Sequence, residues 1–176
     1  MRKDITAEEI LALIEQIIKE HRVMMEGIIT LEHAANDASA ITGLETAKGS
    51  FMPGRFDEKE SLQKMQAQME IVENVIYAHF NNEETRLVDA FKNYGDKNLV
   101  FALQNLLLDH EEIRNRFATS RNQVSELING DLSRQIWEAS AHDLRAHITH
   151  TRWLLGTHAG SEYELLMVLK RKLEQQ

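Results

Sequence analysis

The sequence predicts an all-α protein: an antiparallel up-down four-helix bundle with a short fifth C-terminal helix. Three observations support this fold class. The 176 residues contain one proline and eight glycines, so few residues interrupt a helix. Hydrophobic residues make up 43% of the chain and recur at steps of three and four, the spacing of one helix face. Turn-forming residues gather at a few places, which leaves four long segments between them.

The length of the chain fits one domain with a substantial core. We therefore expect residues 1–176 to form a single domain. Its bundle core should span about residues 6–157, and its C-terminal helix about residues 161–175.

The first two helices have clear start and stop signals. Thr6-Ala-Glu-Glu9 forms a capping box, so the first helix should begin at Thr6 and end near Ala40. Helix breakers are concentrated in the segment 41–56, which we interpret as the long loop of the molecule. The second helix should then run from about Asp57 to Asn93.

The second half of the chain follows the same logic. Tyr94-Gly95-Asp96 is a tight connection, and the third helix should run from Lys97 to Ile128 before Asn129-Gly130 ends it. The fourth helix should run from Ser133 to Thr157.

Two glycines then predict a break in the chain. Gly156 and Gly160 lie at the end of the fourth helix and just beyond it, and Ser161-Glu-Tyr-Glu164 forms a second capping box. This box would open the fifth helix, which either covers the bundle or forms a contact in a homodimer.

Composition excludes several classes of function. The formal charge of −8, without a basic patch, disfavours a nucleic-acid partner. The absence of cysteine leaves histidines and carboxylates as the strong metal ligands. No apolar run reaches the roughly 20 residues of a membrane span, and Met1–Ile10 does not resemble a signal peptide. We expect a cytoplasmic protein.

One histidine lies on the apolar face of each long predicted helix. These are His21, His79, His110 and His147. Counted at about 1.5 Å per residue, they lie roughly 15 to 22 Å from the same end of an up-down bundle. Because a buried imidazole needs a partner for its nitrogens, four of them at one depth indicate a shared site.

Glu83 extends this site, because it follows His79 by one helical turn and shares its face. A buried carboxylate needs a positive partner, and a metal ion among imidazoles supplies one. Iron or manganese suits these ligands, and zinc is compatible with them. The alternative is a network of hydrogen bonds between histidines and Glu83 without a metal.

These residues resemble the hemerythrin-like (HHE cation-binding) family. The matching pieces are EHRVM at His21, HFNNEE from His79, DHEEI at His110 and HITHT from His147, within about residues 6–157. The resemblance implies a four-helix bundle with a carboxylate-bridged di-iron centre. Such centres bind or sense dioxygen, respond to nitric oxide or handle iron.

The sequence departs from the family pattern at two positions. Arg114 stands where the third helix would carry a second histidine, and Thr151 stands where the fourth would carry a carboxylate. His150 is our preferred substitute ligand. Asp143 and Glu111 are the other candidates, although we expect them at the surface or beside a ligand. The remaining histidines are less informative: His33 and His142 are expected at the surface, and His158 lies near the predicted helix end.

The predicted metal ligands are therefore His21, His79, Glu83, His110, His147 and His150. The main hypothesis is a protein that binds or senses dioxygen or nitric oxide at non-haem iron, with two iron ions and no enzymatic activity. One alternative is a di-iron oxidoreductase, which the shortage of carboxylates disfavours. Another is an interaction or regulatory module whose site is degenerate or holds one iron, manganese or zinc ion.

Overall fold

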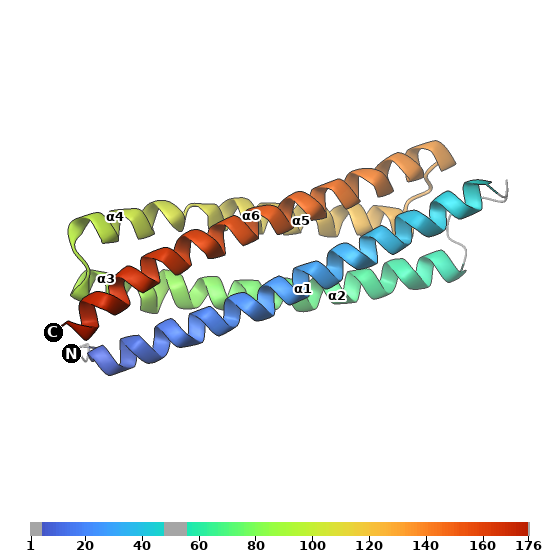
Figure 1. Cartoon of the computed structure of the whole chain (residues 1–176). Helices are drawn as coiled ribbons and strands as arrows, with labels where there is room; N and C mark the ends of the chain where they lie inside the picture. Colours follow the sequence, from blue (N-terminus) through green and yellow to red (C-terminus); the bar gives the residue numbers. More distant parts are fainter. Residues whose placement is uncertain (1–4, 48–55, 176) are drawn as a thin grey trace.

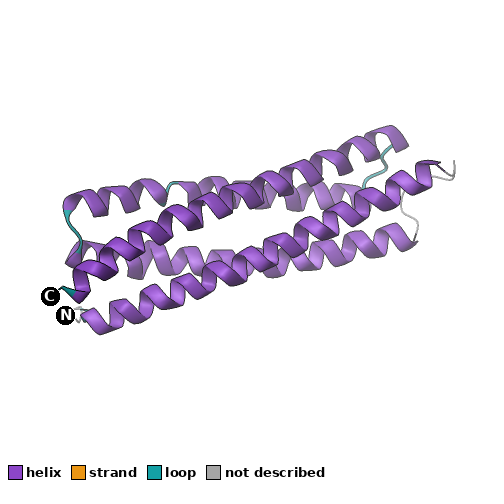
Figure 2. Ribbon diagram, viewed as in Figure 1, coloured by secondary structure: helices purple, strands orange, loops and turns teal. Residues whose placement is uncertain are grey.

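The computed structural model describes residues 5–47 and 56–175 of the chain. Helices account for nearly all of this part, and no strand occurs in it (Figure 2). Four long helical segments lie along one axis, and the two ends of the chain lie at the same end of the molecule (Figure 1). The helices, in chain order, are α1 (Ala7–Ala47), α2 (Phe56–Asn82), η1 (Glu83–Leu87), α3 (Val88–Tyr94), α4 (Lys97–Leu106), α5 (Asp109–Asn129) and α6 (Arg134–Glu174). The predicted all-helical class is confirmed.

Neighbouring segments enclose a common interior. Helix α1 packs against α2 and α6, and α5 packs against the same two helices. Side chains from four sequence regions can therefore meet at one height.

Several predicted helix ends are confirmed by hydrogen bonds. The Glu9 amide donates to Thr6 Oγ1 at 3.2 Å, and the Thr6 amide donates to Glu9 Oε2 at 2.8 Å, which completes the capping box before α1. Asp96 caps α4 by accepting from the Leu99 amide at 3.0 Å. Ser133 caps α6, and α5 ends at Asn129.

The predicted fifth helix is wrong as a separate element. Helix α6 continues through Gly156 and Gly160 to Glu174, so residues 161–174 belong to its last turns. Glycine destabilises a helix interior by only about 1 kcal/mol, which apolar packing readily offsets. Leu166, Leu169 and Leu173 supply this packing, because their side chains are buried in the core. The segment thus covers the bundle interior.

Two other boundaries differ from the prediction. Residues 41–47, assigned to a loop, are helical and end α1, whereas residues 48–55 lie outside the described part of the chain. The predicted third helix is divided into α4 and α5 by a turn at Leu107 and Leu108. In the second segment, a π-helical turn joins α2 to α3.

The core consists of two hydrophobic clusters. One contains Met24, Ile76, Ile113 and Leu155, and the other contains Ile17, Leu87, Leu103 and Leu166. In each long segment, buried polar side chains fall between the residues of the two clusters. A polar layer therefore crosses an otherwise apolar interior.

None of the described helices combines the length and the apolar character that a membrane span requires.

Candidate metal centre

Histidines and glutamates from all four long segments form the polar layer. Each side chain is buried, and even the most exposed of them, His21, is only 8% accessible. The members are His21 on α1, His79 on α2, Glu83 on η1, His110 on α5, and His158 and Glu162 on α6. Buried ionisable groups are rare unless they are paired or bind a metal, so the layer is a candidate metal centre.

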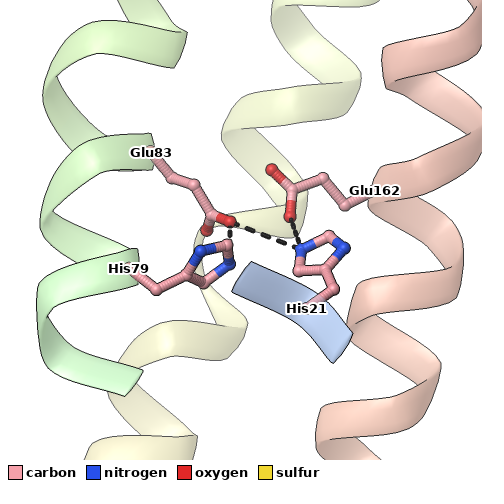
Figure 3. Close-up of side chains that lie close together, drawn as sticks. All are labelled: His21, His79, Glu83 and Glu162. Atoms are coloured by element: carbon pink, nitrogen blue, oxygen red, sulfur yellow. Dashed lines mark hydrogen bonds and ion pairs between the residues drawn. The ribbon is translucent and has the colours of Figure 1, made fainter. Parts of the chain in front are cut away.

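The layer divides into two groups of metal-ligand type that share Glu83. His21, His79, Glu83 and Glu162 form one group, and Glu83, His110 and His158 form the other. Within each group the potential ligand atoms lie within 4.8 Å of one another. In the first group the side chains point toward a common centre from three sides (Figure 3).

Glu83 faces both groups with different oxygens. Its Oε1 contacts Nε2 of His79 and lies 3.6 Å from Nε2 of His21. Its Oε2 lies 2.9 Å from Nε2 of His110 and 3.9 Å from Nε2 of His158. This is the geometry of a carboxylate that can bridge two metal ions.

Local helix structure places these ligands on the inner face. His79 and Glu83 are four residues apart, as are His158 and Glu162, so each pair shares one side of its helix. The π-helical turn begins at Glu83. Such turns inside α-helices are frequent at functional sites.

Electrostatics in the layer favours positive charge. Burial would raise the pKa of Glu83, but the neighbouring imidazoles of His110, His158, His21 and His79 hold that pKa well below its usual range. Burial would lower the pKa of His21, yet Glu162 and Glu83 raise it to about 9. The pKa of His158 also rises against the effect of burial, chiefly because of Glu83. The protons on His21 and His158 thus supply positive charge that a bound metal cation would supply in their place.

Glu162 shows the effect of crowding two carboxylates in one layer. Its own burial raises the pKa of Glu162, and the nearby charge of Glu83 raises it further, while His21 opposes both. A metal ion between the two glutamates would remove this repulsion.

Several inward-facing atoms lack hydrogen-bond partners among the described residues. They are His79 Nε2, both carboxylate oxygens of Glu83 and Oε1 of Glu162. Leaving such groups unsatisfied costs roughly 1–3 kcal/mol each, and more when the group is charged. Metal coordination would satisfy all four atoms, so the residues fit a bound metal.

The outward nitrogens of three histidines have carboxylate partners. His79 Nδ1 lies 2.7 Å from Glu20 Oε2, and His110 Nδ1 lies 2.8 Å from Glu84 Oε1. His158 Nδ1 lies 3.3 Å from Asp109 Oδ2. A proton held on Nδ1 leaves the Nε2 lone pair directed into the layer.

The structure brings together four of the six predicted ligands: His21, His79, Glu83 and His110. It does not bring His147 or His150 to them. His147 is half-buried, and its Nε2 donates to the Arg116 carbonyl at 3.2 Å. Burial and the charge of Arg116 lower the pKa of His147. His150 is exposed, and its Nδ1 accepts from the Arg116 guanidinium at 2.9 Å.

The two departures from the family pattern have structural roles elsewhere. Thr151 is buried, accepts from Arg116 Nε at 3.1 Å and donates to the His147 carbonyl at 2.8 Å. Arg114 pairs with Glu84 at 2.8 Å and lies over the ring of Phe80. Both therefore tie helices together around the layer.

The remaining candidates lie at the surface. Asp143 and Glu111, the proposed substitutes for a missing carboxylate, are both exposed. His33 and His142 are exposed as predicted.

His158 and Glu162 are the two members that the sequence prediction missed. Ending the fourth helix at Thr157 placed its histidine layer about three turns too early. The available signal was a repeat: His158 and Glu162 have the same four-residue spacing as His79 and Glu83. Glu162 thus places a buried carboxylate of the last helix in the layer, where Thr151 offers none.

Comparison of the chain with protein-family models, curated proteins and solved structures gave no match.

Proposed function

We propose that this protein is a hemerythrin-like, antiparallel up-down bundle that binds two iron ions in the polar layer and uses them to bind or sense dioxygen or nitric oxide. The two oxygens of Glu83 carry this proposal, because each faces a different set of imidazoles. Carboxylate-bridged metal pairs in helical bundles are built from glutamates and histidines on facing helices.

Counting the shared Glu83, the two ligand sets offer four groups to one metal and three to the other. His21, His79 and Glu162 would join Glu83 at one metal, and His110 and His158 would join it at the other. The second set is one ligand poorer, which would leave a position for a small molecule. Iron bound there would supply reversible binding of a diatomic ligand through its change of oxidation state.

The donor atoms favour iron among the candidate metals. Mixed imidazole and carboxylate ligands suit iron and manganese, and zinc binds similar atoms in tetrahedral sites. One tetrahedral ion needs four ligands, whereas this layer offers six residues, among them a carboxylate that could bridge two ions.

A di-iron oxidoreductase is the second candidate. The sequence disfavoured it because carboxylates were scarce, but Glu162 now adds a second buried carboxylate beside Glu83. Peroxide-dependent turnover by the iron-loaded protein would favour this candidate over ligand binding.

Metal loading tests the proposal directly. The metal-free protein is titrated with Fe(II) without oxygen, its metal content is measured by mass spectrometry, and optical spectra are recorded before and after dioxygen or nitric oxide. We expect two irons per chain and a spectral change with either gas. One equivalent of bound metal would contradict the two-iron centre. A protein that binds no metal at all would contradict metal binding itself.

A pair of variants locates the site. Glu83→Gln removes the charge of the bridge, whereas Glu70→Gln removes an exposed charge from the same helical segment. We expect loss of iron in the first and full loading in the second. Full loading of both would place the metal elsewhere.

A further inference from the structure

We propose that Glu20, Glu84 and Asp109 form an outer carboxylate ring that positions three histidines for metal binding through Nε2. This inference rests on the proposed function, since it assumes that the polar layer is the metal site. It assigns positioning roles to three residues outside the ligand groups.

The ring is defined by three hydrogen bonds between helices. Glu20 accepts from Nδ1 of His79, Glu84 from Nδ1 of His110, and Asp109 bonds Nδ1 of His158. In every case the other ring nitrogen, Nε2, faces Glu83. The same orientation at three imidazoles on different helices is the observation that carries the proposal.

The ring follows the order of packed helices around the bundle. Glu20 precedes the inner residue His21 on α1 but contacts α2, and Glu84 follows Glu83 on η1 but contacts α5. Asp109 precedes His110 on α5 but contacts α6. Each of these three segments therefore supplies an inner residue and, beside it in the sequence, the carboxylate that contacts a histidine of the next segment.

Each outer carboxylate influences which ring nitrogen of its histidine carries the proton. A neutral imidazole carries its proton on either nitrogen, and only the Nδ1–H form offers the Nε2 lone pair to a metal. A carboxylate at Nδ1 selects that form, fixes the ring plane and raises the basicity of the ligand nitrogen. The layer would then be arranged for a metal before the metal arrives.

Two of these carboxylates are themselves held in place. Arg114 pairs with Glu84 at 2.8 Å, and Asn82 Nδ2 donates to Glu20 Oε1 at 3.4 Å. Glu20 also lines a surface groove of about 480 Å³ between α1 and Val75. The side chains of Glu20, Glu84 and Asp109 are 25%, 37% and 55% exposed, so replacing them does not open the core.

The test uses zinc as a diamagnetic probe and one matched control. Glu20→Gln, Glu84→Gln and Asp109→Asn are compared with Glu111→Gln. Glu111 is exposed and follows His110 in the sequence, whereas Asp109 precedes it. Zn(II) affinity is measured by competition with a chelator. We expect each ring variant to bind about 10–100-fold more weakly than the wild type, the range typical of such partners, and Glu111→Gln to bind unchanged. Ring variants that match Glu111→Gln would overturn the proposal.

A second measurement does not depend on metal. Nitrogen NMR of the metal-free, histidine-labelled protein reports which ring nitrogen of His79 and His110 carries the proton. We expect a proton on Nδ1 of both rings in the wild type, and loss of this preference after Glu20→Ala for His79 or Glu84→Ala for His110. A bare Nδ1 in the wild type would overturn the ring. If the wild type shows Nδ1–H but binds no metal, the proposed function fails while the ring stands.

Discussion

Glu162 Oε2 lies 2.9 Å from Nε2 of His21, although 141 positions separate the two residues in the sequence. The contact joins α6 to α1, the pair of helices at the two ends of the chain. It closes the polar layer on the side that the sequence-based prediction had left without a carboxylate.

Glu162→Gln should weaken metal binding without unfolding the protein. The amide keeps the size and an acceptor oxygen, but it removes a negative charge that would face the metal. We expect a loss of affinity at least as large as the roughly 10–100-fold typical of outer partners. Chelator competition measures it, and Glu164→Gln, an exposed change on the same helix, is the control. Equal affinities in the two variants would exclude Glu162 as a ligand.

His158→Ala and His147→Ala should have different effects. His158 faces Glu83, so we expect His158→Ala to lower the metal content of the protein. His147 bonds a backbone carbonyl, so His147→Ala should keep full metal content and lower the free energy of unfolding by about 1 kcal/mol. Metal analysis and urea denaturation measure the two effects. Metal loss in the His147 variant alone would restore the ligand set predicted from sequence.

Gly160→Ala tests the continuity of α6. A Cβ added at Gly160 meets nothing within 4 Å, so the helix should gain up to about 1 kcal/mol of stability. At Gly95 a Cβ would lie 2.6 Å from the Phe91 carbonyl oxygen, and Gly95→Ala should destabilise the protein. Urea denaturation compares both variants with the wild type. Destabilisation by Gly160→Ala would indicate that the helix ends there after all.

Tyr77 should titrate above the usual pKa of a tyrosine. Its burial, and then its hydrogen bond to Glu73, raise the pKa of Tyr77 from 10.0 to about 12. Because the pKa is raised in the folded state, the associated stability is complete below pH 10 and is lost as the pH rises toward 12. Phenolate absorbance should show a component that titrates near pH 12. Tyr77→Phe should remove this component, and its persistence in that variant would contradict the assignment.

Much of the fold followed from local sequence signals. The capping box at Thr6, the connection at Tyr94-Gly95-Asp96 and the helix end at Asn129 all depend on residues close in the chain, and the structure contains each of them. The apolar periodicity likewise indicated which face of each helix is buried.

Four ligand candidates could also be found without a structure. His21, His79, Glu83 and His110 interrupt the apolar faces of their helices. The helix ends used to estimate their depth, at Thr6, Asn93 and Lys97, agree with the structure to within a residue. For these helices, residue counts from the ends gave the right depth, because helical rise is nearly constant.

Only the tertiary structure decided the contribution of the last helix. Locally, Gly156 and Gly160 favour a break, and nothing nearby in sequence opposes it. Burial of Leu166, Leu169 and Leu173 against other helices outweighs that local cost and keeps α6 continuous. The sequence by itself determined an all-helical chain with a histidine layer. Long-range packing decided that His158 and Glu162 complete the layer, because the depth of a side chain depends on where its whole helix lies.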